Sequence, residues 1–363
     1  DAPPHRHHRR RQLFGTSLWF SASSAADDLM RQWGASPPTS GSLTNATQLG
    51  FILGTRLRRL RPGRPFPANA SSPSAPCSAP VANAGFAFLA GGIDAGILWR
   101  FAVGLSAGRR PPLGGMKLVV GWEPERAGAA LSVAGRHAHL GTSLPQGIRA
   151  GLGTAWPWRS VGPASITGGG RGPAILAPRR RAVRKRSHGA AVTLGGVLPF
   201  AFQIPVYRAS ALNYFGHQWE LYAMWTLVPM LVAKAGHRRP GRHPALAFAI
   251  IGIGAASAAC SAATSRHIGS ARVAAIPRFH LGRGNASIFQ QGSAARAAAG
   301  TDAAVGNVRD SRSPAVLFGD VGETCRHQIV GNALAIQNSL GFAITMGSIA
   351  LATRLVDDWG SRL

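Results

Sequence analysis

Residues 329–353 read IVGNALAIQNSLGFAITMGSIALAT, and this stretch contains no charged side chain. A second run, PALAFAIIGIGAASAACSAATS at 244–265, is also uncharged. A helix needs about 20 mostly apolar residues to cross the hydrocarbon core of a bilayer, and both runs are long enough. Helices of soluble proteins normally carry a polar stripe. The two runs therefore predict membrane-spanning helices, and the alternative is a soluble protein with buried helices.

Shorter apolar segments alternate with basic clusters along the rest of the chain. If the segments are successive spans, most arginine clusters, from 6–11 onward, lie in loops on one side of the membrane, and the positive-inside rule makes that side cytoplasmic. The N-terminus is then cytoplasmic, and the opposite loops hold Asp27, Asp28, Asp94, Asp357 and Asp358. Arg238, Arg239 and Arg242 break the pattern. The shorter segments are 12–26, 42–55, 81–93, 96–108, 127–148 and 212–233.

The charge balance of 40 basic to 13 acidic residues, a net +27, is typical of nucleic-acid-binding proteins. However, the chain has only three lysines, although lysine binds phosphate well. Codons made of G and C alone encode Gly, Ala, Pro and Arg, so a GC-rich gene explains much of the charge. A basic, partly disordered nucleic-acid-binding protein using RRRAVRKR (179–186) is the alternative from another class. It does not explain the uncharged runs.

Motifs for enzymatic chemistry are missing from the sequence. There is no P-loop, no defensible nucleophile–base arrangement, and no metal-ligand spacing around Cys77, Cys260 and Cys325. We therefore expect neither an enzyme, nor a tightly bound cofactor, nor a metal site.

Several segments together resemble the major facilitator superfamily of secondary transporters. They include LFGTSLWFSASSAADDLMRQWGAS (13–36), LTNATQLGFILGT (43–55), LWRFAVGLSAG (98–108) and NYFGHQWELYAMWTLVPMLVA (213–233), followed by the 329–353 run. The resemblance implies an all-α, polytopic transmembrane bundle of two six-helix halves around a central cavity. It also implies a monomeric transporter in a bacterial inner membrane. Such a protein moves a small solute by alternating access, with protons or another gradient as the driving force.

The resemblance divides the chain into an N-terminal half at 12–159, a basic linker at 160–205 and a C-terminal half at 206–363 that lacks its last helix. Interludes rich in Arg, Pro, Gly and Ser replace the expected apolar sequence in several places. Shifted reading frames in a GC-rich gene explain this composition. A genuine chain with unusual linkers and a non-functional remnant of a transporter are the alternatives. The interludes are 56–80, 106–112, 133–139, 160–188 and 277–326.

Candidate site residues come from two helices. Arg100 matches the arginine that the family associates with substrate or proton coupling, and Trp19 would line the cavity wall. Tyr214, His217 and Glu220 share a helical face, and an ionisable group at membrane depth usually faces a cavity or a partner. The alternatives are a snorkelling Arg100, a lipid-facing Trp19 and a helix end at the membrane interface for 213–225.

Four amides are expected to join helices rather than to bind substrate. Asn45 and Gln48 share a face of the second span, and Gln337 and Asn338 lie in the 329–353 run. In the family's fold these two helices meet near the interface between the halves. We therefore expect interhelical hydrogen bonds there.

Overall fold

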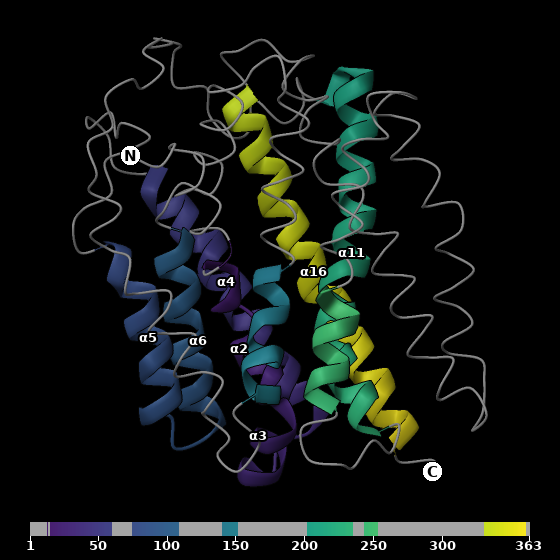
Figure 1. Ribbon diagram of the computed structural model, residues 1–363. Helices are drawn as coiled ribbons and strands as arrows, with labels where there is room; N and C mark the ends of the chain where they lie inside the picture. Colours follow the sequence, from purple (N-terminus) through teal and green to yellow (C-terminus); the bar gives the residue numbers. More distant parts are fainter. Residues whose placement is uncertain are drawn as a thin grey trace, which may run out of the picture.

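The computed structural model describes residues 13, 15–59, 75–108, 140–151, 202–234, 243–252 and 330–360. Across these residues the regular secondary structure is helical throughout (Figure 1). The labelled helices are α2 (Ser21–Ser24), α3 (Ala26–Trp33), α4 (Pro37–Arg59), α5 (Ala75–Leu89), α6 (Ile93–Gly108), α11 (Pro205–Lys234) and α16 (Val330–Gly360). Two further helices cover 140–151 and 243–252. We refer to the described residues up to 151 as the N-terminal half and to those from 202 as the C-terminal half.

One described segment, Ile336–Asp358 in α16, is long and apolar enough to cross a membrane. It includes most of the uncharged run at 329–353 that predicts a spanning helix. Two shorter apolar helices occur at Ser78–Leu89 and His243–Gly252. The second of these is the start of the 244–265 run, whose remaining residues lie outside the described part of the chain.

The first helical segment, residues 15–33, is interrupted rather than continuous, and we call it helix 1. Residues 18–20 form a turn and a bend, α2 follows, and a turn at Ala25 separates α2 from α3. Two serine hydroxyls donate to nearby carbonyls here. Ser21 Oγ donates to the carbonyl of Leu18 at 2.9 Å, and Ser24 Oγ donates to that of Ser21 at 2.7 Å. Such side-chain bonds to nearby carbonyls compete with regular helical geometry and often bend helices.

A three-residue connection reverses the chain between α3 and α4. Gly34 adopts the left-handed conformation, with φ of 61°, and the amide of Ala35 donates to the carbonyl of Met30. Glycine is the usual residue for this helix end because it has no Cβ to clash. Ser36 then caps α4 by accepting from the amide of Thr39, and Pro37 occupies the first helical position, where no amide donor is needed.

The closest helix packing in the N-terminal half joins α4 to α6. Gly50 and Gly54 on α4 face Gly104 and Gly108 on α6. A Cβ on Gly104 would lie 1.8 Å from the carbonyl oxygen of Thr47, and one on Gly108 would lie 2.3 Å from that of Phe51. Small residues spaced four apart on both helices therefore allow the two backbones to touch.

Among the described residues, the two halves meet at several helix pairs, including helix 1 with α11. α16 packs against α11 within its own half and against α4 of the other half (Figure 1). At Gly41 of α4, an added Cβ would lie 2.9 Å from Thr353 of α16. At Gly147 in the helix 140–151, it would lie 2.9 Å from the ring of Phe248 in the helix 243–252. Both contacts depend on a glycine facing a side chain.

The helix ends differ in part from the boundaries that the interludes predict. α4 continues through Arg59, α5 already begins at Ala75, and α6 ends at Gly108, so the edges of the 56–80 and 106–112 interludes are helical. Arginine and leucine are good helix formers, and a long arginine side chain can reach water from a helix end, which explains the extension of α4. The other interludes and the predicted linker up to residue 201 lie outside the described residues.

The contact between α4 and α6 predicts a difference between two otherwise similar substitutions. Gly104→Ala should lower the thermal unfolding midpoint of the purified protein in detergent, because overpacking typically costs about 1–3 kcal/mol and here the obstacle is backbone. The matched control is Gly216→Ala in α11, where an added Cβ meets nothing within 4 Å. That variant should unfold at or slightly above the parent midpoint. Equal midpoints for the two variants would contradict the packing described here.

Candidate functional site

Arg100 of α6 is fully buried and holds three helices of the N-terminal half together. One terminal nitrogen donates to the carbonyl of Leu18 at 2.9 Å, to Ser21 Oγ at 3.1 Å and to Asn83 Oδ1 of α5 at 2.8 Å. The other terminal nitrogen donates to the carbonyl of Trp19. The guanidinium carbon also lies 5.5 Å from the centre of the Phe86 ring.

The interruption of helix 1 explains why a charged side chain lies at this point. The carbonyls of Leu18 and Trp19 belong to the turn at 18–20, where they do not accept regular helical bonds from within the segment, and a guanidinium offers five donors in a fixed plane. Of the three guanidinium nitrogens of Arg100, the Nε has no hydrogen-bond partner among the described residues. The described contacts of Arg100 therefore lie within the N-terminal half.

An aromatic cluster lies where the two halves meet. Trp19 packs edge-on against Phe51 of α4 and tilted against Phe342 of α16, with ring centres 5.1 Å apart in both cases. Tyr222 of α11 contacts Phe342 at 5.4 Å and Trp225 at 5.4 Å. Trp19, which the sequence predicts to line a cavity wall, therefore lies among rings from both halves. Phe20 adds a further contact, to Trp225 at 5.2 Å.

The predicted site face of α11 is mostly turned into the bundle. Tyr214 and His217 are buried, and Glu220 is half-buried. The hydroxyl of Tyr214 donates to Asn338 Oδ1 of α16 at 2.8 Å, and Tyr214 also covers Gly341. Tyr214 and Asn338 are thus brought together within the C-terminal half.

The amides of α4 contact α16 across the interface between the halves. Asn45 Nδ2 donates to the carbonyl of Met346 at 3.2 Å, and Gln48 Oε1 accepts from the Thr345 hydroxyl. Their remaining amide atoms, Asn45 Oδ1 and Gln48 Nε2, are buried without a partner among the described residues. Gln337 is also fully buried, and neither of its amide atoms has a partner in that part of the chain.

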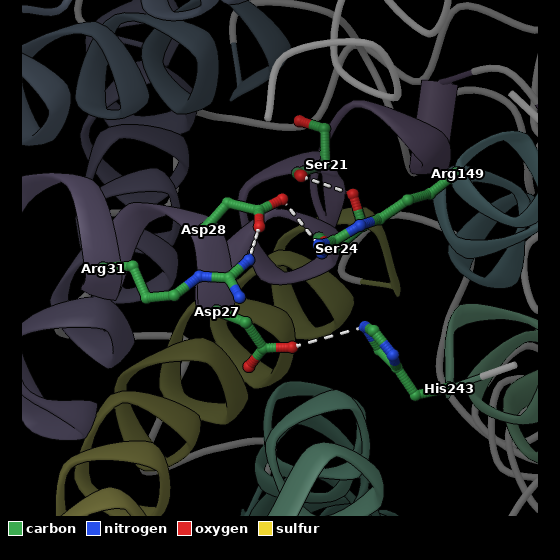
Figure 2. A network of polar contacts seen from close by, with 7 residues as sticks. All are labelled: Ser21, Ser24, Asp27, Asp28, Arg31, Arg149 and His243. Carbon is green, nitrogen blue, oxygen red and sulfur yellow. Dashed lines mark hydrogen bonds and ion pairs between the residues drawn. The ribbon is translucent and has the colours of Figure 1, made fainter. Parts of the chain in front are cut away.

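The structure adds a charged network at the end of helix 1 that the sequence does not predict (Figure 2). Arg149, from the helix 140–151, donates to Asp28 Oδ2 at 2.5 Å and to the carbonyl of Ser24. Arg31 pairs with the other carboxylate oxygen of Asp28. The side chains of Asp28 and Arg149 are only 7% and 4% exposed, whereas that of Arg31 is 74% exposed. We call these three residues, with Asp27 and His243, the Asp28 network.

The expectation that the five aspartates lie in loops is wrong. Asp94 is in the first turn of α6, and Asp357 and Asp358 lie near the end of α16. Asp27 and Asp28 are helical as well. Both are in the first turn of α3, where the positive end of the helix dipole favours carboxylates. Arg149 forms the ion pair that offsets the free-energy cost of burying the Asp28 carboxylate, since a buried charge is costly unless it is paired. Its position inside the apolar stretch LGTSLPQGIRA (140–150) is the only sequence signal that could have indicated such a pair.

The described residues include no group of three or more His, Cys, Asp or Glu side chains that could hold a metal ion. The Asp28 network brings together two carboxylates, but Arg149 and Arg31 already occupy Asp28. Its chemistry is therefore that of charge pairing.

No protein-family model matches the sequence, and no curated protein matches it. Solved structures do match in shape. A D-xylose–proton symporter superimposes with a TM-score of 0.67 at 16% identity, over 95% of this chain and 89% of the symporter. The xylose transporter XylE from E. coli, in a partially occluded inward-open conformation, gives 0.65 at 12% identity over 96% and 90%. The nucleoside transporter NupG gives 0.66 at 10% identity over 96% and 90%.

The chain has the major facilitator fold. This confirms the all-α bundle expected from the sequence. The contact of α4 with α16 and that of the helix 140–151 with the helix 243–252 join the N-terminal half to the C-terminal half as defined above. Among the residues singled out above, Trp19, Asn45 and Gln48 make contacts across this interface, whereas the described bonds of Arg100 and Tyr214 stay within one half.

The Asp28 network predicts a large loss of stability when one partner is removed. Asp28→Ala leaves Arg149 buried without its carboxylate and should cost about 3–5 kcal/mol of unfolding free energy. The control is Asp357→Ala, at an exposed carboxylate near the end of α16. Thermal unfolding in detergent measures both.

Removing both charges should be milder than removing one. The double variant Asp28→Asn with Arg149→Gln removes both buried charges and leaves only the exposed Arg31 without its partner, so it should unfold at a higher temperature than Asp28→Ala. If Asp28→Ala unfolds at the same temperature as the parent, the pair does not contribute to stability.

Proposed function

We propose that this protein is an integral membrane secondary transporter that moves a small polar solute by alternating access. The observation that carries the proposal is the interface between the halves. It contains buried polar side chains that are only partly satisfied: Asn45 Oδ1 and Gln48 Nε2 lack partners in the described part of the chain. A buried amide atom without a hydrogen-bond partner lowers the stability of the fold, so a contact with a structural role alone would not be expected to keep it. A solute or water passing between the halves would supply the missing hydrogen bonds.

The fold supports the same proposal by analogy. The matching structures include a D-xylose–proton symporter and a nucleoside transporter, and both names describe transport of polar, hydroxyl-bearing molecules. A fold alone does not fix a substrate, because specificity depends on a few cavity side chains. We therefore propose a neutral polar solute as the class and the gradient of protons as the driving force.

The residues proposed for this function lie on both sides of the interface. Trp19 would form part of the cavity wall. His217 and Glu220 on α11 would be the protonatable groups, because they are the imidazole and the carboxylate on the predicted site face. Arg100 would act by holding helix 1 in its interrupted path, which places Trp19 at the interface.

Two experiments, done one after the other, test membrane integration and then transport. The protein should stay in the membrane pellet after alkaline carbonate and need detergent for release. A basic nucleic-acid-binding protein would instead be released by high salt or carbonate. Purified protein in proteoliposomes should then accumulate radiolabelled pentoses or nucleosides when the outside is acidified, and empty liposomes provide the background. Absence of uptake for every solute, with the protein shown to be folded, would favour a non-transporting remnant.

Glu220→Gln separates proton coupling from solute binding. If Glu220 carries the proton, this variant should lose gradient-driven accumulation, by about 10-fold or more, while still exchanging labelled for unlabelled solute at equilibrium. The control is Asp357→Asn, at an exposed carboxylate on α16. Accumulation by Glu220→Gln equal to that of the parent would exclude Glu220 as the coupling group.

A further inference from the structure

The amides of Asn45 and Gln48 lie about one helical turn apart on α4, where this helix contacts α16 of the other half. Asn45 Nδ2 donates to the carbonyl of Met346, and Gln48 Oε1 accepts from the hydroxyl of Thr345. Gln48 is fully buried, and Asn45 Oδ1 and Gln48 Nε2 have no hydrogen-bond partner among the described residues. Each amide is therefore held by one of its polar atoms and presents the other one.

A role in joining the two helices does not account for these amides. The Thr345 hydroxyl also lies 2.7 Å from the carbonyl of Phe342 in its own helix, and its single proton can serve only one of the two acceptors. The carbonyl of Met346 lies within α16, where it has a backbone donor one turn along the helix. Both partners on α16 can thus do without the amides, whereas each amide keeps a buried polar atom that is costly to leave unpaired.

Apolar side chains from both halves close the interface on either side of the amides. On one side, four aromatic rings pack against one another, and we call them the aromatic layer: Trp19 of helix 1, Phe51 of α4, Tyr222 of α11 and Phe342 of α16. On the other side is a second group, which we call the Ala26 layer: Ala26 of α3, Leu227 and Met230 of α11, and Val356 of α16.

Polar side chains lie between these two layers on several helices. On α4 and on α16, Gln48 and Thr345 each lie about one helical turn from the ring of the aromatic layer on the same helix. On helix 1, Ser23 lies between the two layers, and its hydroxyl is 3.3 Å from that of Thr44 on α4. The unpaired amide atoms therefore belong to a polar level that is enclosed by apolar contacts between the halves.

The two unpaired atoms restrict the chemical group that can bind there. Asn45 Oδ1 can only accept, because the Met346 carbonyl needs the donor of the same amide. Gln48 presents its NH₂ group, or its carbonyl if the amide turns over and donates to Thr345. A carboxylate or a phosphate only accepts, so it leaves Asn45 unpaired. A hydroxyl both donates and accepts, so it satisfies both amides in either orientation of Gln48.

We propose that Asn45 and Gln48 form a binding site for hydroxyl groups of the solute, between the aromatic layer and the Ala26 layer. The solute class is a polyhydroxyl compound, a polyol or an aldose. It would enter when α4 and α16 separate. One hydroxyl would then donate to Asn45 Oδ1, and the same or a neighbouring hydroxyl would accept from Gln48 Nε2. This inference rests on the transport function proposed above and adds the chemical class of the solute.

A first measurement needs no solute. Gln48→Met keeps nearly the length and volume of the side chain and removes both amide atoms, while Thr345 keeps a carbonyl of its own helix as acceptor. The thermal unfolding midpoint of the purified variant in detergent should equal or exceed that of the parent, because an unpaired buried group is removed. The matched control is Asn83→Leu, which should unfold at a clearly lower temperature, because the Asn83 amide accepts from Arg100 and Ser21.

The second measurement is the binding of xylitol, D-xylose and D-ribose to the same detergent-purified proteins, followed by the unfolding midpoint as a function of concentration. Osmolytes also stabilise proteins without binding, so the parent and Gln48→Met are compared at equal concentration. The parent should bind at least one probe, and Gln48→Met should bind it about tenfold more weakly, as expected for the loss of one hydrogen bond. Betaine, which has no hydroxyl group, should raise both midpoints equally.

Asn45→Leu should weaken probe binding to a similar extent, and it provides the test if Gln48→Met does not purify as a folded protein. The proposal is overturned if both variants lower the midpoint as much as Asn83→Leu, because the amides then serve to hold helices together. It is also overturned if none of the three probes distinguishes the parent from the variants.

These outcomes are separate from the outcome for transport. Probe binding that requires Gln48, without uptake into proteoliposomes, would support the site and count against transport. Uptake of a solute whose binding is unchanged in Gln48→Met would support transport and overturn the site.

Discussion

The guanidinium of Arg100 lies where helix 1 is interrupted. It donates hydrogen bonds to carbonyls that would accept from backbone amides in a continuous helix. Its bonds to the carbonyls of Leu18 and Trp19 fix the path of the turn. Residues on either side of that turn then reach different partners: Trp19 meets the aromatic rings of the other half, and Asp28 meets Arg149. Both the interface cluster and the charged network therefore depend on where Arg100 holds this one segment.

Much of the fold follows from the distribution of apolar residues, and the chemistry that specifies the site follows only in part. The uncharged run at 329–353 predicts a long helix, and α16 covers most of it. Asn45 and Gln48 can be assigned to one helical face from their spacing alone. The partners of Arg100 could not be predicted, because two of them are carbonyls made available by an irregular turn. The pair of Asp28 and Arg149 joins residues 121 positions apart, and nothing local to either residue indicates the other.

The helix contacts fall into two kinds with different consequences for motion. α4 and α6 touch backbone to backbone through glycines, so they can separate or slide only by losing close packing along their whole contact. α4 and α16 touch through side chains. These include the amides of Asn45 and Gln48, each of which has one polar atom without a hydrogen-bond partner among the described residues. Side chains can change rotamers and exchange partners at low cost, whereas backbones cannot. A relative movement of the halves would therefore occur at α4 and α16, with α4 and α6 moving as one body.

The glycine contact also has a consequence at the level of the gene. At Gly104 an added Cβ would lie 1.8 Å from the carbonyl oxygen of Thr47, so every other amino acid would push α4 and α6 apart for the same reason. Any change in the first or second base of a glycine codon replaces glycine, whereas changes in the third base are silent. The codons at Gly50, Gly54, Gly104 and Gly108 should therefore vary only at their third base in any lineage that keeps this protein working. In a genome biased toward G and C, the third base of these codons would be mostly G or C as well.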